Sequence, residues 1–185
     1  MQDSPVTDIE LVRRVIDGDG ESFRTLMERY RDPAMALALN MLTNFQDAED
    51  ACQEGFLRAY TYIRKFDITR SFRNWLFAVV ANACLDQLRK KRRFLRFAGR
   101  LKSEQFAEAA SRPAASPTAG ACDLARLRSL SPKERACLYL WSQEGYSGEE
   151  IAAALGCSRQ TAYVHLFRAR AKLKTALDEA KNASP

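Results

Sequence analysis

The sequence lacks the residue pattern on which most zinc centres depend. Its only histidine is His165, and no Cys-x-x-Cys pair occurs among its five cysteines, Cys52, Cys84, Cys122, Cys137 and Cys157. Structural zinc sites are usually built from such pairs together with histidines. We therefore expect no metal site and no cofactor, and we interpret the cysteines as reduced packing residues.

Long apolar runs are also missing. No stretch of the chain is apolar for the length that a bilayer-spanning helix needs. Residues 1–10 are polar and acidic, whereas a secretory leader is basic and then apolar. These features predict no membrane insertion and a cytoplasmic location.

Strand-like alternation and catalytic groupings of residues are absent as well. Apolar residues recur at helical spacing, and capping-box patterns at 7–10, 131–134 and 147–150 mark helix starts. His165 has no nucleophile, metal ligand or carboxylate to act with, so we interpret it as a neutral surface or groove residue. The sequence predicts an all-α protein with no catalytic residues and no enzymatic activity.

Positive charge is in excess and is concentrated in one segment. Lys and Arg number 29 against 23 for Asp and Glu, which gives a net charge of +6 and favours polyanionic partners. Residues 89–102 contain no acidic residue, and residues 103–120, rich in Ala and Ser with two prolines, read as a linker. We predict two helical domains, 8–95 and 124–178, joined by a flexible linker over 96–123.

The second domain contains a helix-turn-helix pattern. A short amphipathic helix is expected at 149–155 and a longer one at 159–174, with Gly156 supplying a positive φ and Ser158 capping the second helix. One stripe of the second helix faces the core, namely Ala162, Leu166, Ala169 and Leu173. Such a helix enters the DNA major groove, with Gln160 and Arg168 as base-reading candidates. A helical hairpin with a solvated basic face is the alternative.

The first domain combines an aromatic cluster with an acidic segment. Phe66, Phe72, Trp75 and Phe77 precede a stripe bearing Asn82 that leads into the basic run, an arrangement suited to single-stranded DNA. Taken singly, Phe72 and Trp75 are more often core residues. In 47–57 the inward positions are Ala48, Cys52 and Phe56, and the outward ones are Asp50, Gln53, Glu54 and Leu57. An acidic outward face in a DNA-binding chain calls for a different partner, although the helix dipole accounts for some of the carboxylates.

At these residues the sequence resembles the extracytoplasmic-function (ECF) sigma factors, the minimal form of the sigma-70 family. The resemblance covers 11–93 and 127–177. It is carried by Asp47-Ala48-Glu49-Asp50-Ala51-Cys52-Gln53-Glu54-Gly55-Phe56, Phe66-Asp67, Phe72-Arg73-Asn74-Trp75-Leu76, Asp86-Gln87-Leu88-Arg89, Leu130-Ser131-Pro132-Lys133-Glu134-Arg135, Glu150-Ile151-Ala152 and Phe167-Arg168-Ala169-Arg170-Ala171-Lys172-Leu173.

The resemblance implies a role in transcription initiation and assigns residues to each contact. The clamp helices of the largest subunit of core RNA polymerase would be bound by Asp50, Gln53, Glu54 and Leu57. The melted strand of the −10 promoter element would lie against the segment before Trp75 and against Lys65, Phe66 and Asn82, and its backbone against Arg89, Lys90, Arg92 and Arg93. The −35 element would be read by Ser158, Arg159, Gln160, Thr161, Tyr163, Val164 and Arg168. The linker would run toward the RNA exit path, and an anti-sigma factor wedged between the domains is a further expected partner.

One segment departs from the family pattern. Where the family usually has Gly-Thr-Val followed by basic or hydroxyl residues, residues 160–165 read Gln-Thr-Ala-Tyr-Val-His, which leaves fewer donors for phosphates and guanines. Two alternatives remain open at this point. An ordinary helix-turn-helix regulator would lack the acidic face and the aromatics, and a sigma mimic that only sequesters an anti-sigma factor would need no basic run.

Overall fold

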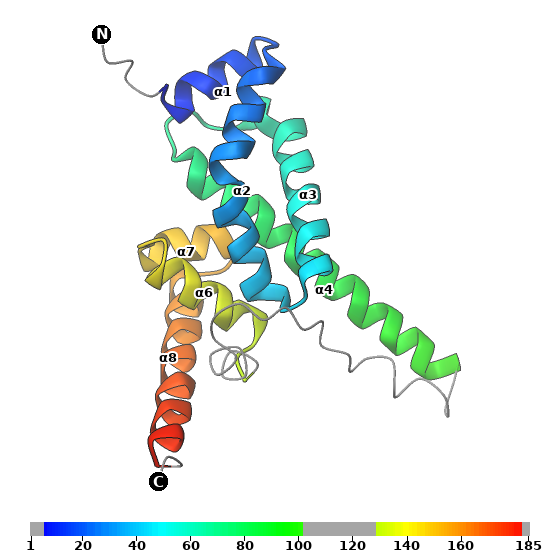
Figure 1. Ribbon diagram of the computed structural model, residues 1–185, viewed down its shortest axis with the longest axis vertical. Coiled ribbons are helices and arrows are strands. Elements are labelled where there is room, and N and C mark those ends of the chain that lie inside the picture. Colours follow the sequence, from blue (N-terminus) through cyan, green and yellow to red (C-terminus); the bar gives the residue numbers. More distant parts are fainter. Residues whose placement is uncertain (1–5, 102–128, 183–185) are drawn as a thin grey trace.

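The computed structural model describes residues 6–101 and 129–182, and every regular element in them is helical (Figure 1). The first domain comprises α1 (Asp8–Ile16), α2 (Gly20–Leu42), α3 (Phe45–Tyr62), a 3-10 turn (Ile63–Lys65) and α4 (Phe72–Leu101). The second comprises α6 (Pro132–Ser142), α7 (Gly148–Leu155) and α8 (Arg159–Asn182). The prediction of an all-α fold with two helical domains is confirmed. None of the helices in the described ranges is long and apolar enough to cross a membrane.

The three predicted capping boxes are all present. Thr7, Ser131 and Ser147 each accept a hydrogen bond from the backbone N–H three residues on, and the glutamate there accepts one from the cap backbone in return. These bonds satisfy N–H groups that a helix start otherwise leaves without partners. The local sequence therefore fixes where α1, α6 and α7 begin.

The first domain is built around the close approach of α3 and α4. Ala48, Cys52 and Phe56 of α3 are buried, as predicted. At Gly55 a Cβ atom would lie 2.8 Å from Val80 Cγ2 of α4, so only glycine allows the two backbones to come this near. This packing fixes the orientation of the opposite, outward face of α3.

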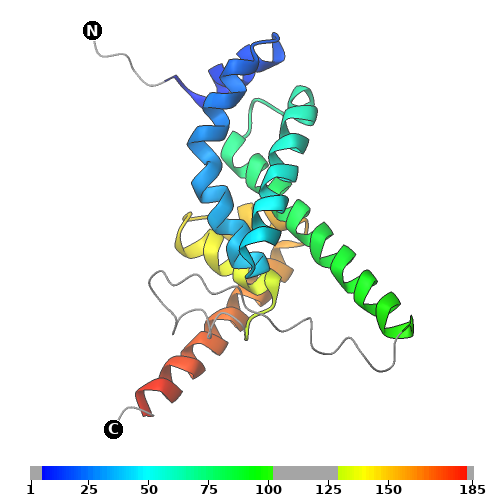
Figure 2. The ribbon, with the colours of Figure 1, turned by 45° about the vertical axis from the view of Figure 1, so that its right-hand side comes forward.

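The end of α4 differs from the prediction. We expected the linker to begin at residue 96, but the helix continues to Leu101. In Figures 1 and 2 this last part of α4 projects away from the rest of the molecule, and Phe94 and Phe97 are 66% and 63% exposed. The remainder of the predicted linker, 102–123, lies outside the described residues, as does Cys122.

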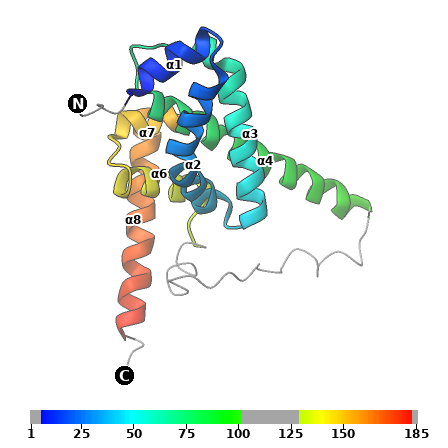
Figure 3. The ribbon, with the colours of Figure 1, turned by 45° about the horizontal axis from the view of Figure 1, so that its top comes forward.

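The helix-turn-helix has the predicted turn geometry. Gly156 adopts φ 59°, and Ser158 accepts a hydrogen bond from the Thr161 N–H at 3.1 Å. Ala162, Leu166 and Ala169 are buried, whereas Leu173 is only half-buried. α8 is longer than expected and extends well beyond α6 and α7 (Figure 3).

The two domains pack directly against each other, α6 on α2 and α7 on α4. Arg135 of α6 is buried and donates hydrogen bonds to the backbone carbonyls of Asn40 and Met41, at the C-terminus of α2. The last carbonyls of a helix have no partner within it. The second domain thus supplies the polar partner that caps a helix of the first.

Further contacts join α4 to the loop between α6 and α7 and to α7 itself. Arg73 forms an ion pair with Glu144, and Asn74 Nδ2 donates to Glu150 Oε1 at 2.7 Å. The rings of Phe77 and Tyr146 stack with centroids 6.2 Å apart. Polar and apolar contacts together make one continuous core across the described parts of both domains.

Three cysteines are buried in this core, as their interpretation as packing residues predicted. Burial raises the pKa of the Cys52 thiol to about 11, and burial is also the main cause that raises those of Cys84 and Cys137 to about 12. Cys157, in the helix-turn-helix, is half-buried and free.

Candidate protein-binding groove and nucleic-acid interfaces

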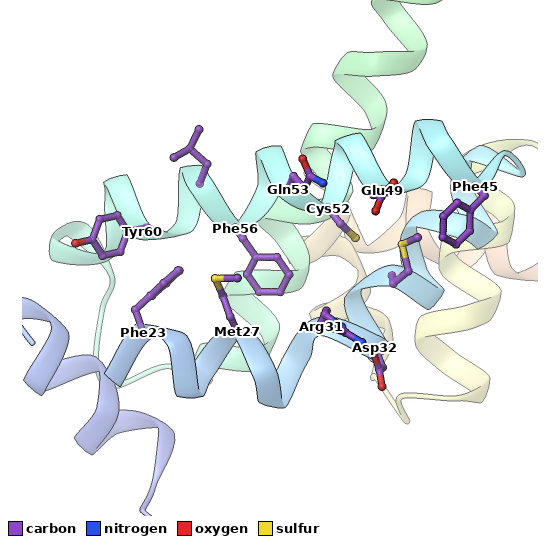
Figure 4. A pocket seen from close by; sticks show the side chains of 12 residues that line it. Phe23, Met27, Arg31, Asp32, Phe45, Glu49, Cys52, Gln53, Phe56 and Tyr60 are labelled. Carbon is purple, nitrogen blue, oxygen red and sulfur yellow. Dashed lines mark hydrogen bonds and ion pairs between the residues drawn. The ribbon is translucent and has the colours of Figure 1, made fainter. Parts of the chain in front are cut away.

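A largely apolar groove of about 820 Å³ runs between α2 and α3 (Figure 4). Several of its side chains are exposed although they are large and apolar: Met27 is 38%, Phe45 55%, Leu57 62% and Tyr60 50% exposed. The whole lining consists of Phe23, Met27, Arg31, Asp32, Met35, Phe45, Glu49, Cys52, Gln53, Phe56, Leu57 and Tyr60. A contiguous exposed patch of this kind between two helices fits the apolar face of a partner helix.

The four residues predicted to bind polymerase lie on α3 but face two different depressions. Gln53 and Leu57 line the apolar groove. Asp50 and Glu54 line a smaller depression between α3 and α4, together with Ala51, Arg58, Ala83, Asp86, Gln87 and Lys90. All four are exposed. The sequence did not indicate that α2 contributes to the groove. The signal that could have shown it is the pair Met27 and Met35, two apolar residues outside the buried stripe of α2.

An ion-pair network fixes the acidic side of α3 to α4. Arg58 donates to Glu54 Oε1 at 2.6 Å and to Asp86 Oδ2 at 2.8 Å, and Arg89 donates to Asp86 Oδ1 at 2.7 Å. The hydrogen bond from Arg58 lowers the pKa of Asp86. Glu54 is therefore held in position while remaining accessible.

The aromatic cluster is part of the core, which corrects the prediction for Phe66. That ring is 6% exposed, and its centroid lies 5.1 Å from Trp75 and 5.7 Å from Phe72. Aromatic rings gain more from burial against each other than from exposure, so no base can stack on Phe66 in this conformation. Trp75 is half-buried, and Phe72 and Phe77 are fully buried.

The exposed groups near the predicted −10 surface are different ones. Lys65 and Asn82 are exposed, as expected for recognition residues. Beside Lys65 lies the 49% exposed ring of Tyr62, with the lysine Nζ 5.3 Å from its centroid. Tyr62 was not predicted, because it stands before the aromatic cluster, in the last turn of α3.

The basic part of α4 is exposed from Arg89 to Arg93. Arg89 is paired with Asp86, and Lys91 with Asp47 at 2.8 Å. Arg92 and Arg93 form no ion pair with any residue that the structure describes, so their charges are free for phosphates.

The start of α8, the helix predicted to bind DNA, presents a mixed surface. Gln160, Tyr163, Val164 and Phe167 fall at helical spacing on one exposed face, and Phe167 is 74% exposed. The Tyr163 ring packs on Gly148, where a Cβ would lie 2.6 Å from its Cζ. Phe167 was not among the predicted site residues. Apolar groups in the major groove contact the methyl group of thymine.

Arg159 and His165 differ in their surroundings. Arg159 Nη1 pairs with Glu149 of α7 at 2.7 Å and lies over the Tyr163 ring. His165 is half-buried, and burial, with the nearby Lys133 charge, lowers its pKa, which agrees with the expected neutral imidazole.

Comparison with protein families gives two matches in the order of the domains. Residues 26–94 match the model for Sigma-70 region 2, and residues 124–173 match the model for Sigma-70, region 4. The chain belongs to the sigma-70 family, in its ECF group. Below, α1–α4 are called region 2 and α6–α8 region 4.

Several ECF sigma factors align over most of the chain. The ECF RNA polymerase sigma factor SigM of Mycobacterium tuberculosis H37Rv is 31% identical, with 90% of this chain and 83% of that protein covered. SigE of Mycolicibacterium smegmatis is 32% identical over 92% and 68% of the two chains. With SigW of Bacillus subtilis the identity is 40%, but the match spans only 44% of this chain and 43% of that protein.

Two solved structures have a fold similar to that of this chain over most of its length. The sigma factor RpoE in complex with the anti-sigma factor NepR from Bartonella quintana superimposes with a TM-score of 0.69 at 25% identity, over 85% of this chain and 98% of that one. CnrH in complex with the cytosolic domain of CnrY gives 0.66 at 28% identity, over 93% and 97%.

Proposed function

We propose that this ECF sigma factor binds core RNA polymerase, recognises −10 and −35 promoter elements and initiates transcription of a signal-responsive set of genes. The observation that carries the proposal is the separation of surfaces. The apolar groove with its acidic border suits a protein partner, whereas the basic end of α4 and the start of α8 suit DNA. Polymerase carries out the chemistry, so the chain needs no catalytic residue, and its place of action is the cytoplasm.

The groove between α2 and α3 is the docking site for the clamp helices of the largest polymerase subunit. Gln53 and Leu57 supply its α3 side, and Met27 and Tyr60 extend it. Asp50 and Glu54, in the neighbouring depression between α3 and α4, meet cations of the partner. This surface separates the proposal from an ordinary helix-turn-helix regulator, which has no need of it.

Region 2 and region 4 contact different promoter elements. Lys65, Tyr62 and Asn82 face the melted −10 strand, while Arg92 and Arg93 contact its backbone. Region 4 places Arg159, Gln160, Tyr163, Val164 and Phe167 in the −35 major groove. These cationic surfaces argue against a sigma mimic.

An anti-sigma factor is a further proposed partner. The RpoE and CnrH structures are complexes, the first with an anti-sigma factor and the second with CnrY. In this chain the direct packing of region 4 on region 2 fills the space that a wedge between the domains would occupy. A partner of the closed chain would therefore bind an outer surface such as the α2–α3 groove.

Pull-down with core polymerase tests the groove. Gln53→Ala and Leu57→Arg should abolish binding, and Leu177→Arg, which changes an equally apolar exposed residue far along α8, should not. Glu54→Lys should also abolish binding, although it additionally breaks the Arg58 pair. Retention of polymerase by the groove variants would disprove the docking assignment.

Transcription in vitro with purified core polymerase and genomic DNA tests the function as a whole. Mapped start sites should share sequences at −10 and −35. Initiation no different from that of core polymerase alone would contradict the proposal.

A further inference from the structure

The segment 92–97, near the end of α4, carries an apolar face that no other helix in the described ranges covers. Phe94 is 66%, Leu95 51% and Phe97 63% exposed. None of the three belongs to the hydrophobic core or packs against it. In Figures 1 and 3 this end of α4 stands clear of the other helices. Large apolar side chains gathered at the surface mark a site where an apolar ligand excludes water.

The arginines of this segment lie on the other side of the helix. At about 100° per residue, Arg92 and Arg96 are each about 160° around the helix axis from Phe94. Arg93 falls only about 40° from Phe97 and therefore borders the apolar face. All three arginines are exposed, and they form no ion pair with any residue that the structure describes. The segment is an amphipathic helix with aromatic residues on one side and uncompensated positive charge on the other.

This distribution discriminates between the anionic surfaces that the segment can bind. A site for single-stranded DNA needs rings and cations together, so that bases stack while the backbone is held. The phosphates of a duplex use arginines but offer nothing to Phe94, Leu95 and Phe97. An anionic bilayer uses both sides of the helix, because the apolar side enters the boundary between headgroups and acyl chains while the arginines reach the phosphates. A second copy of this chain is disfavoured, since it would bring like charges together.

We propose that residues 92–97 form a peripheral binding site for anionic phospholipids, with Phe94 and Phe97 below the headgroups and Arg93 on their phosphates. The other two arginines are attracted by the negative potential of the membrane surface. The helix lies along the membrane and does not cross it. One consequence rests on the proposed function: Arg92 and Arg93 also contact the −10 backbone, so phospholipid and −10 DNA bind this segment in alternation.

Flotation of the full chain with lipid vesicles, without polymerase or DNA, tests the site. The chain should bind vesicles of phosphatidylglycerol and phosphatidylcholine in equal parts and should not bind vesicles of phosphatidylcholine alone. Phe94→Ser with Phe97→Ser should weaken binding about tenfold or more, because two rings no longer leave water. Leu95→Ser should weaken it by a smaller factor, whereas Leu177→Ser, at a leucine of similar exposure in α8, should not. Circular dichroism checks that each variant keeps its helices.

A second matched pair of variants tests the contribution of charge. Arg96→Gln should weaken binding to the anionic vesicles about fivefold, since one cation near the membrane surface is lost. Lys174→Gln makes the same change in net charge at an exposed site of α8 and should leave vesicle binding unchanged. Equal losses in the two variants would show a response to net charge alone and would overturn the site.

The double phenylalanine variant also separates phospholipid from nucleic acid as the ligand of the apolar face. It should lose vesicle binding and keep its affinity for a single-stranded −10 oligonucleotide, measured by fluorescence anisotropy. Loss of the oligonucleotide with retention of vesicles would make the face a nucleic-acid site, and retention of both would mean that the rings serve neither ligand. Either result would overturn the proposal. Because no polymerase is present, these outcomes are independent of whether the chain directs promoter-specific transcription.

Discussion

Residues 65 and 66 are neighbours with opposite environments. Phe66→Ala should lower the free energy of unfolding by about 3–5 kcal/mol, because it removes a ring packed on Phe72 and Trp75. Lys65→Ala should change stability by less than about 0.5 kcal/mol and weaken binding of a single-stranded −10 oligonucleotide. Urea unfolding and fluorescence anisotropy measure the two effects. Equal losses of stability would show that the 3-10 turn is a structural unit and that Lys65 belongs to it.

Phe167 allows a test of how region 4 reads DNA. Replacing thymine by uracil at the contacted position removes one methyl group and should weaken −35 binding by the unmodified protein. Phe167→Ala should weaken binding to the thymine duplex, and uracil should then cause no further loss. Band-shift titrations of both proteins with both duplexes give the coupling energy between the Phe167 ring and the thymine methyl group. Additive losses would place the ring away from the methyl group.

Gly55 sets the spacing of α3 and α4. Gly55→Ala should cost about 1–3 kcal/mol of stability, since the new methyl would overlap Val80, which must shift together with its backbone. Gly20→Ala, at the first position of α2 with nothing within 4 Å, is the matched control and should be neutral or slightly stabilising. Thermal unfolding of both variants measures these two changes in stability. A neutral Gly55→Ala would mean that the helices can separate at no cost.

The Arg58–Asp86 pair between α3 and α4 should appear in the acid stability of the protein. The Arg58 hydrogen bond lowers the pKa of Asp86 from its ordinary value of 3.8. A carboxyl with a lowered folded-state pKa stabilises fully above its ordinary value and loses that contribution as the pH falls below it. Asp86→Asn should therefore reduce stability near neutral pH, and the deficit should shrink below about pH 4. Urea titrations across this range measure it, and a deficit that persists unchanged in acid would exclude the carboxylate as its source.

Helix starts and buried faces were predictable because their causes are local. Residues only three or four positions apart determine the capping boxes, the positive φ of Gly156 and the inward positions of α3. The ends of α4 and α8 were placed too early, since a basic run signals no helix end and no glycine or proline stops either helix there. Phe66 was misjudged because a pattern of aromatic residues does not say which rings meet in the core.

At the scale of the whole molecule, the contact between regions 2 and 4 had no sequence signal. Arg135 and Glu144 look like ordinary surface charges until the fold brings Met41 and Arg73 against them. The continuous core predicts a single cooperative unfolding transition for the unmodified chain. Arg135→Ala should divide this single transition into two, one for each region, and calorimetry measures the number of transitions. Two transitions in the unmodified chain would mean that the regions unfold independently.

The burial of three cysteines determines how the protein reacts with oxidants. Peroxides and thiol reagents react with the thiolate, and the raised pKa values of Cys52, Cys84 and Cys137 leave almost none of it at neutral pH. These three positions are therefore inert toward oxidants while the chain is folded. Among the described cysteines, only Cys157 is half-buried and not fully buried, which makes it the natural attachment point for a probe on the second helical domain.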